Sequence, residues 1–239
     1  MFGLKLPTRK TGREEGEKPF WISYSDMMTA LMVLFLVVMT VALLAVTNEA
    51  SETEKQKTQR EEEIAKLLAK IKESTKDFPG IVIHGNTIDF GEQVRFGTDS
   101  HQLTDEQERM LRKFIPMVLK AARDPLGQKW VRRVVVEGFA DKRGTYLHNL
   151  NLSLQRSQRV LCTLLAKSAP EEVPLTEEDR LLIREIFLVG GSSFNSLKDS
   201  LEESRRIEVK LEFLDIGEKR PKSPDVPMDE VQPCPLDCK

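Results

Sequence analysis

A carboxylate stands at the entrance to the longest apolar stretch of the chain. Asp26 directly precedes Met27–Val46, in which only Thr29 and Thr40 carry polar side chains. A helix needs about 20 such residues to cross the hydrocarbon core of a bilayer. An ionisable residue at membrane depth is costly, about 2.5–3.5 kcal/mol at the centre of a span, and by default it marks a functional site. The sequence therefore predicts a functional role for Asp26 at the edge of the membrane.

Two hydroxyl side chains are expected on the same helical face as this carboxylate. Thr29 follows Ser25 by four residues and Asp26 by three, and these spacings bring its side chain close to both on a helix. A face of small polar residues suits close packing against other helices, which must supply the rest of an ion path. We predict that Ser25 and Thr29 line the channel. The alternative is that Asp26 caps the helix N-terminus, where aspartate is favoured.

A second pair of charged residues flanks a predicted turn between a strand and a helix. Asp141 follows the apolar strand Val134–Val136, and Arg156 lies in the helix predicted over residues 149–167. A carboxylate accepts hydrogen bonds from an ammonium group, and a guanidinium forms bidentate bonds with a carboxylate. Backbone N–H groups at the start of the helix favour the same anion. The alternative is that Asp141 caps a turn and Arg156 is a solvated helix residue.

Positioning these residues requires a membrane helix and a folded domain. The 239 residues suffice for one span and one domain of about 130 residues. Interleaved strand and helix patterns predict an α+β fold, with α/β as the alternative. The predicted segments are a cytoplasmic tail (1–20), a transmembrane helix (21–46), a juxtamembrane linker helix (47–80), the folded domain (81–215) and a Pro-rich, disordered tail (216–239).

The linker helix carries one short apolar stripe. Its members recur at helical spacing and are Ile64, Leu67, Leu68 and Ile71. The stripe could pair with a second copy of the chain, or it could pack on the domain that follows.

Charge patterning predicts the orientation in the membrane. Five basic residues precede the span, namely Lys5, Arg9, Lys10, Arg13 and Lys18, whereas the first charged residues after it are acidic. The positive-inside rule places the N-terminus in the cytoplasm of a cell with an inner membrane and the folded domain in the periplasm. The net charge of −2 gives no general case for nucleic-acid binding.

The three cysteines permit a disulfide in an oxidising compartment. Cys234 and Cys238 could form a local bridge near the C-terminus, whereas Cys162 lies in an apolar stretch and is expected in the core. Their spacing does not fit a four-ligand metal site, so no metal is predicted. The sequence also lacks a nucleotide-binding loop and a catalytic triad pattern, so we expect the chain not to be an enzyme.

Residues Pro19–Met32 resemble the start of the ion-carrying helix in the MotB family of stator subunits. The resemblance implies that Asp26 takes up and releases the transported ion. It also implies that two copies of the chain lie inside a five-subunit ring of a MotA-like partner. It also implies that the linker helix could plug the channel. The transported ion would be H⁺, with Na⁺ as an alternative, and no cofactor is implied.

The stretch from Val134 to Arg156 resembles the peptidoglycan-binding signature of OmpA-like domains, and Arg205–Val209 resembles their closing strand. The likeness covers about residues 81–215. It implies that the chain binds peptidoglycan, whose diaminopimelate-containing stem offers ammonium and carboxylate groups. The implied site residues are Asp141, Asn149, Leu152 and Arg156.

Residues Lys18–Met39 look most like the MotB-like members of Zorya anti-phage defence systems. Taken together, the resemblances predict a peptidoglycan-anchored stator-type subunit of an ion-driven inner-membrane motor that acts in defence. One alternative is a flagellar-type or transport-energising stator. The other is a passive envelope anchor in which Asp26 only caps a helix.

Overall fold

The computed structural model describes residues 18–166, 175–220 and 234–237. The chain divides into two compact units, Met1–Gln56 and Lys57–Lys239, which are treated separately below. The predicted cytoplasmic tail, except for its last three residues, lies outside the described part of the chain.

The first unit contains the membrane-crossing part of helix α1, which runs from Lys18 to Ser74. This helix is long and apolar enough to cross a membrane. Side chains along the apolar stretch are exposed, as expected of a surface that faces lipid or partner helices. The hydroxyl of Thr40 donates to the carbonyl oxygens of Leu36 and Val37, at 3.0 and 2.8 Å, so its polar group is satisfied within the helix.

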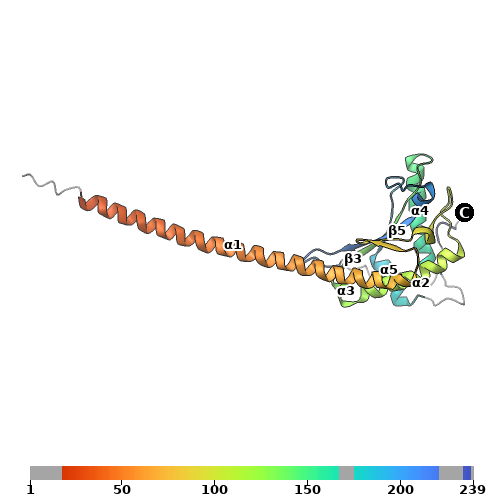
Figure 1. The fold of residues 1–239 in the computed structure, drawn as a ribbon, viewed down its shortest axis with the longest axis horizontal. Coiled ribbons are helices and arrows are strands. Elements are labelled where there is room, and N and C mark those ends of the chain that lie inside the picture. The colour runs from red at the N-terminus through yellow and green to blue at the C-terminus, as the bar shows by residue number, and fades with distance from the viewer. Residues whose placement is uncertain (1–17, 167–174, 221–233, 238–239) are drawn as a thin grey trace, which may run out of the picture. The chain divides into compact units, whose positions relative to one another are not determined.

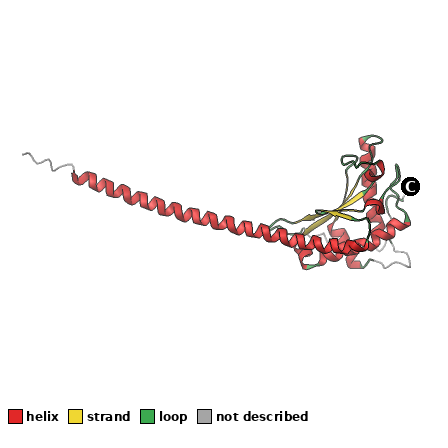
Figure 2. Cartoon of the chain, viewed as in Figure 1, coloured by secondary structure: helices red, strands yellow, loops and turns green. Residues whose placement is uncertain are grey.

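The second unit is built on a five-stranded mixed sheet (Figure 2). The spatial order is β1-β2-β5-β3-β4, and only the β3–β4 pair is parallel. The strands are β1 (Val82–His84), β2 (Thr87–Asp89), β3 (Val131–Gly138), β4 (Phe187–Gly191) and β5 (Ile207–Phe213). Alternating apolar residues in β5 face the core, as their period of two predicted. The predicted α+β class is confirmed.

Helices pack beside this sheet and complete the core (Figure 1). They are α2 (Asp105–Arg123), α3 (Pro125–Trp130), α4 (Tyr146–Leu165), α5 (Glu177–Ile186) and the short α6 (Leu201–Ser204). Single 3-10 turns lie at η1 (Thr75–Asp77) and η2 (Gly91–Val94). Thr104 and Thr176 each form a complete capping box, which satisfies backbone donors at the starts of α2 and α5.

The last turns of α1 belong to the folded domain. Leu67 is fully buried and Ile71 is 3 % exposed, and both lie in the same core cluster as the strands. Arg60 Nε also donates to the carbonyl of Leu214 at 2.8 Å. The compact unit therefore begins at Lys57 rather than at the predicted residue 81. Of the two alternatives for the apolar stripe, packing on the following domain is the one observed.

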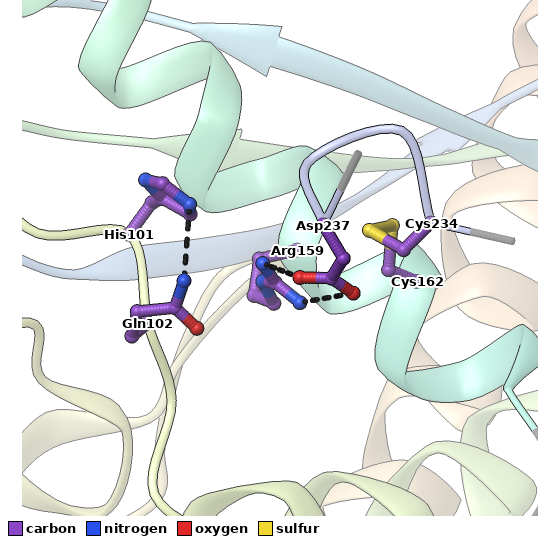
Figure 3. Close-up of a disulfide and its surroundings, with 6 residues drawn as sticks. All are labelled: His101, Gln102, Arg159, Cys162, Cys234 and Asp237. Carbon is purple, nitrogen blue, oxygen red and sulfur yellow. Dashed lines mark hydrogen bonds and ion pairs between the residues drawn. A yellow bond between two sulfur atoms is a disulfide. The ribbon is translucent and has the colours of Figure 1, made fainter. Parts of the chain in front are cut away.

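The C-terminal segment is more ordered than predicted. The Arg220 guanidinium donates to the carbonyl oxygens of Val131 and Gly127, which holds the chain just after β5 against the domain. Residues Cys234–Asp237 are also placed, beside α4 (Figure 3). The predicted disordered tail is therefore wrong for residues 216–220 and 234–237. Its remaining residues lie outside the described part of the chain.

Candidate functional site

A pocket of about 230 Å³ opens where β3 leads into α4. The residues around it come from three places: the segment after η2, the β3–α4 loop and the first turns of α4. They are Thr98, Asp99, Asp141, Arg143, Gly144, His148, Asn149, Leu152 and Arg156. All four residues predicted to bind peptidoglycan therefore line one pocket.

Close packing of α4 against the sheet positions this pocket. A Cβ added to Gly138 at the end of β3 would lie 2.0 Å from the carbonyl oxygen of Ser153 on α4. On the neighbouring strand, a Cβ on Gly191 would lie 2.6 Å from Ser153 Oγ. The Ser153 hydroxyl accepts from the backbone N–H of Ser193 at 3.1 Å, which fixes the helix against the end of β4. Only glycine permits this approach, and it brings one face of α4 to the β3–α4 loop.

Asp141 is the acidic centre of the pocket and is only 6 % exposed. Its Oδ2 accepts from Arg143 Nη2 at 2.7 Å and from Arg205 Nη1 at 3.2 Å. The bonds from Arg143 are the main reason that the pKa of Asp141 lies well below its usual range, and together with Arg205 they outweigh the opposite effect of burial. The carboxylate is therefore ionised at neutral pH. The backbone N–H of Arg143 also donates to Oδ1, so Asp141 does cap a turn, as one alternative predicted.

Arg156 is fully buried, so the alternative of a solvated helix residue is wrong. Its Nε, Nη1 and Nη2 donate to the carbonyl oxygens of Ser100, Phe139 and Gly97 at 2.9, 2.7 and 3.0 Å. Burial, assisted by the nearby charge of Arg205, lowers the pKa of Arg156 to about 10, which still leaves it protonated at neutral pH. These bonds use three of its five N–H groups and hold its charge in the wall of the pocket.

Asn149 and Leu152 contribute shape to the pocket. Asn149 is 2 % exposed, and its Nδ2 donates to the carbonyl of Arg143 at 2.7 Å, which closes the β3–α4 loop onto the helix. Leu152, one turn further on, supplies an apolar part of the lining. The helix begins at Tyr146, three residues before the predicted start, because Thr145 accepts from the backbone N–H of His148 as its N-cap.

Sequence reasoning missed several residues of this pocket. Arg143 was detectable, because an Asp followed two residues later by a basic residue can form a turn closed by its side chain. Its Nη2 also reaches Thr98 Oγ1 at 3.1 Å. Asp99, which pairs with His148 at 2.7 Å, and Arg205 arrive from distant segments, for which the sequence holds no local signal.

The pocket is arranged to bind a small ligand that carries both charges. Three guanidinium groups, from Arg143, Arg156 and Arg205, surround one ionised carboxylate, so an added carboxylate is attracted. The carboxylate of Asp99, exposed beside the pocket, is available to a positive group. Among the described residues, no group of three His, Cys, Asp or Glu side chains could hold a metal ion.

The predicted ion-carrying residue lies well inside helix α1. Asp26 comes eight positions after Lys18, where α1 begins, so the alternative that Asp26 is the N-cap is wrong. Its neighbours on the same face are Ser25 and Thr29, as the spacing predicted. Thr29 Oγ1 donates to the carbonyl oxygens of Ser25 and Asp26 at 3.0 and 2.9 Å, so its proton is used within the helix. Only its oxygen lone pairs can face an ion.

The cysteine pairing differs from the prediction. Cys234 is bonded to Cys162 on α4, 72 residues earlier, so the local bridge to Cys238 is wrong. Cys238 itself lies outside the described residues. The apolar neighbours of Cys162 suggested a core position, but its side chain is the anchor of the C-terminal segment (Figure 3). A disulfide fits a domain that resides in an oxidising compartment.

One family model and several solved structures are similar to parts of this chain. The family described as "Membrane MotB of proton-channel complex MotA/MotB" matches residues 7–60. Among solved structures, the periplasmic domain of Helicobacter pylori MotB is 12 % identical, with a TM-score of 0.38, and the match covers 56 % of this chain and 80 % of that one. The cell wall anchor of the T6SS from Pseudomonas aeruginosa is 20 % identical, with a TM-score of 0.38, and covers 62 % of this chain and 97 % of its own.

A full-length relative gives the family. Zorya protein ZorB from Escherichia coli O139:H28 is 41 % identical over 234 residues, which are 97 % of this chain and 95 % of that protein. This relative and the family model confirm the predicted MotB-type resemblance. Membership among MotB-like proteins also agrees with the expectation that the chain is not an enzyme. At this identity over nearly the whole length, the chain belongs to the ZorB family of MotB-like Zorya proteins.

Proposed function

We propose that the chain is a peptidoglycan-anchored stator-type subunit of an ion-driven inner-membrane motor that acts in anti-phage defence. Asp26 carries the ion, and H⁺ is favoured over Na⁺. The observation that carries this proposal is the place of Asp26, which lies in the interior of an apolar helix and is not used as a cap. A carboxylate kept at membrane depth without a structural task is best explained by ion transport.

The ion path needs other chains. The side chains around Asp26 on α1 are exposed, and a carboxylate facing lipid cannot pass an ion. In the proposed complex, two copies of the chain lie inside a ring of five MotA-like ZorA subunits, whose helices enclose the face formed by Ser25, Asp26 and Thr29. Each proton that crosses 100 mV releases about 2.3 kcal/mol, several times the thermal energy, to drive a conformational step.

The folded domain anchors the complex to the cell wall. The N-terminus lies in the cytoplasm and the domain in the periplasm, as the basic residues before the span favour. The pocket binds the peptide stem of peptidoglycan at a diaminopimelate residue. A stem carboxylate bonds to Arg143 and is attracted by the buried charge of Arg156, and the stem ammonium bonds to Asp99 or Asp141.

Phage plating tests the motor half of the proposal. Cells that carry the native operon are compared with cells that carry Asp26→Asn, with matched amounts of protein in the membrane. Asparagine keeps the size of the side chain but cannot be ionised, so protection should be lost while the complex still assembles. The control is Thr40→Val, about four helical turns further along α1, which should protect fully. Full protection by Asp26→Asn would contradict the ion-carrying role.

Binding to purified peptidoglycan sacculi tests the anchoring half. Full-length protein in detergent micelles is pelleted with sacculi, and the fraction bound is measured. Arg143→Gln should reduce binding, because it removes a charge beside the pocket while Asp141 keeps Arg205. The control, Lys142→Gln, removes a neighbouring charge from a residue that does not line the pocket. Equal loss of binding in both variants would indicate non-specific attraction to the sacculi.

In the phage-plating experiment, a wild-type operon that does not protect cells would favour another kind of stator.

A further inference from the structure

The C-terminal residues Cys234–Asp237, here called the clasp, are fixed to the middle of α4. A disulfide joins Cys234 to Cys162, and a bidentate ion pair joins Asp237 to Arg159 (Figure 3). Arg159 Nη2 and Nη1 donate to the two carboxylate oxygens of Asp237 at 2.7 and 3.2 Å. The clasp is thus held by a covalent bond and a charged pair one helical turn apart.

The ion pair matters because Arg159 is buried. The residue is only 6 % exposed, and its Nε has no hydrogen-bond partner among the described residues. All the hydrogen bonds that its guanidinium makes there are to Asp237. Without the clasp, a buried positive charge would be left without its counter-charge, a situation that proteins avoid by rearranging or by admitting water.

The same face of α4 holds one wall of the proposed binding pocket. Arg156, Arg159 and Cys162 are spaced by three residues, so they follow one another along the helix. Arg156 binds the carbonyl oxygens at both ends of Gly97–Ser100, the segment that brings Thr98 and Asp99 to the pocket. The clasp therefore lies next to the arginine that shapes the pocket.

His101 lies between the ligand pocket and the clasp. It directly follows the segment held by Arg156, and it lies near Arg159 and Asp237 (Figure 3). Burial, together with the charges of Arg159 and Arg156, lowers the pKa of His101, and the charge of Asp237 opposes this change. The segment Gly97–Gln102, here called the pocket wall, is thus placed between the ligand pocket on one side and the clasp on the other.

We infer that the clasp is a positioning element of the pocket: by supplying the counter-charge of Arg159, it keeps the pocket wall in the form that binds the cell wall. The inference rests on the proposed peptidoglycan-binding function. The clasp is complete only after oxidation. The thiols of Cys162 and Cys234 exchange with the disulfide of an oxidising protein, which takes up two protons and two electrons and is released as a dithiol. Full wall binding therefore depends on an oxidising compartment.

Hydrogen exchange of the pocket wall and pelleting with sacculi test the inference together. Full-length protein in detergent micelles is compared in its oxidised form and after treatment with a small dithiol. The reagent leaves as a cyclic disulfide, and its two hydrogens remain on Cys162 and Cys234. Reduction should speed amide exchange over residues 97–102 and weaken binding to sacculi by about tenfold. The variant Cys234→Ser should behave like the reduced protein without any reagent.

Charge variants separate positioning from simple stabilisation. Asp237→Asn keeps the disulfide but removes the counter-charge of Arg159. Amide exchange in the pocket wall should therefore become faster, and binding to sacculi should weaken. Asp237→Glu restores the charge, so it should recover much of the slow amide exchange and much of the binding to sacculi. The matched control is Glu212→Gln, which removes the carboxylate paired with Arg133 on the sheet, outside the pocket. It should lower stability without changing exchange of residues 97–102 or binding.

The outcomes distinguish this inference from the proposed function. If oxidised wild type binds sacculi, and the reduced and Asp237→Asn proteins bind equally well with unchanged exchange, the inference is overturned and the anchoring function stands. If oxidised wild type does not bind sacculi, the proposed function fails, and exchange alone decides whether the clasp holds the pocket wall. Faster exchange in the reduced and Asp237→Asn proteins would then support the clasp, and unchanged exchange would overturn it.

Discussion

Asp26 and Asp141 are both carboxylates at places where the chain is proposed to work, yet their surroundings are opposite. Asp141 is almost buried and accepts hydrogen bonds from Arg143 and Arg205. Asp26 is exposed, and its carboxylate has no hydrogen-bond or ion-pair partner among the residues that the structure describes. The first is held in one charge state by its own chain. The second is left open to partners and to a change of charge.

The difference shows how one chain can serve two tasks. A binding site gains from side chains that are fixed before the ligand arrives, because less ordering is then required on binding. An ion carrier must bind and release its ion, and a permanent guanidinium partner would keep its carboxylate ionised. In the proposed motor, partners for Asp26 come from other subunits, which would also control when the ion is taken up.

The largest effect on the folded domain is expected for Arg156→Met. The change leaves three carbonyl oxygens without their donor in a buried place, which should reduce the free energy of unfolding by about 3–5 kcal/mol. Urea unfolding of the full-length protein, followed by tryptophan fluorescence, would measure it. The control is Arg109→Met on the exposed face of α2, which should change stability little. A similar small change for both would mean that Arg156 is a ligand-binding group without a structural task.

The contrast between the two carboxylates is tested by the same substitution, Asp to Asn, at Asp141 and at Asp26. Asp141→Asn removes the counter-charge of two guanidinium groups and should lower the free energy of unfolding by about 2 kcal/mol. Asp26→Asn should leave unfolding of the domain unchanged, because Asp26 lies in the other unit of the chain. Thermal unfolding in detergent micelles would compare them. A loss of stability from Asp26→Asn would break the contrast.

A third carboxylate separates the effect of partners from that of position. Glu63 is on α1, like Asp26, but it accepts from Lys129 Nζ and Trp130 Nε1 at 2.6 Å each. These bonds lower the pKa of Glu63 from 4.5 to about 2. Because the pKa is lower in the folded state, the contribution of Glu63 to stability is present above pH 4.5 and is lost as pH falls towards 2.

The expected result is that Glu63→Gln destabilises the domain at pH 7 and loses most of that effect near pH 2. Urea midpoints of wild type and variant across this range would show the two curves converging as the pH falls. Asp26→Asn, measured in parallel, should run along the wild-type curve throughout. A Glu63→Gln deficit that is constant with pH would mean that the side chain acts through packing rather than charge.

The smallest effect is expected for a matched pair of threonines on α1. Thr29 and Thr40 make the same two hydrogen bonds to the preceding turn, so replacing either by valine should change helix stability by less than about 0.5 kcal/mol. Thr29 lies within one helical turn of Asp26, whereas Thr40 lies about four turns further along α1. Thr29→Val should therefore weaken phage protection in plating assays and Thr40→Val should not. Equal protection by both would remove Thr29 from the channel lining.

Local patterns in the sequence predicted much of the fold and the centre of the site. The interleaved strand and helix patterns, the apolar strand Val134–Val136 and the spacing from Asp141 to Arg156 all depend on contacts within an element or a short loop. The misses are contacts between distant segments. The disulfide spans 72 residues, and the partner Arg205 reaches Asp141 from the start of β5, so neither has a local signal.

The role of Arg156 was also incompletely predicted, for a different reason. Its place in the pocket followed from spacing and resemblance. Its three bonds to backbone carbonyls did not, because a sequence does not say which main-chain groups a fold leaves without partners. A guanidinium has five N–H donors, which can bond to the protein backbone or to a ligand, and only the structure shows which donors bond to the backbone.

The buried stripe of α1 limits how this domain can be exchanged between proteins. Leu67 and Ile71 complete its core although they precede the first strand. A chimaera that joins a foreign membrane helix to this domain at residue 81 would leave a hollow where these side chains belong, and would expose the apolar surface that they cover. A junction before Lys57 keeps the whole module. Whether the domain folds in another stator therefore depends on the residue at which the two sequences are joined. This requirement must be met before the domain can bind the cell wall.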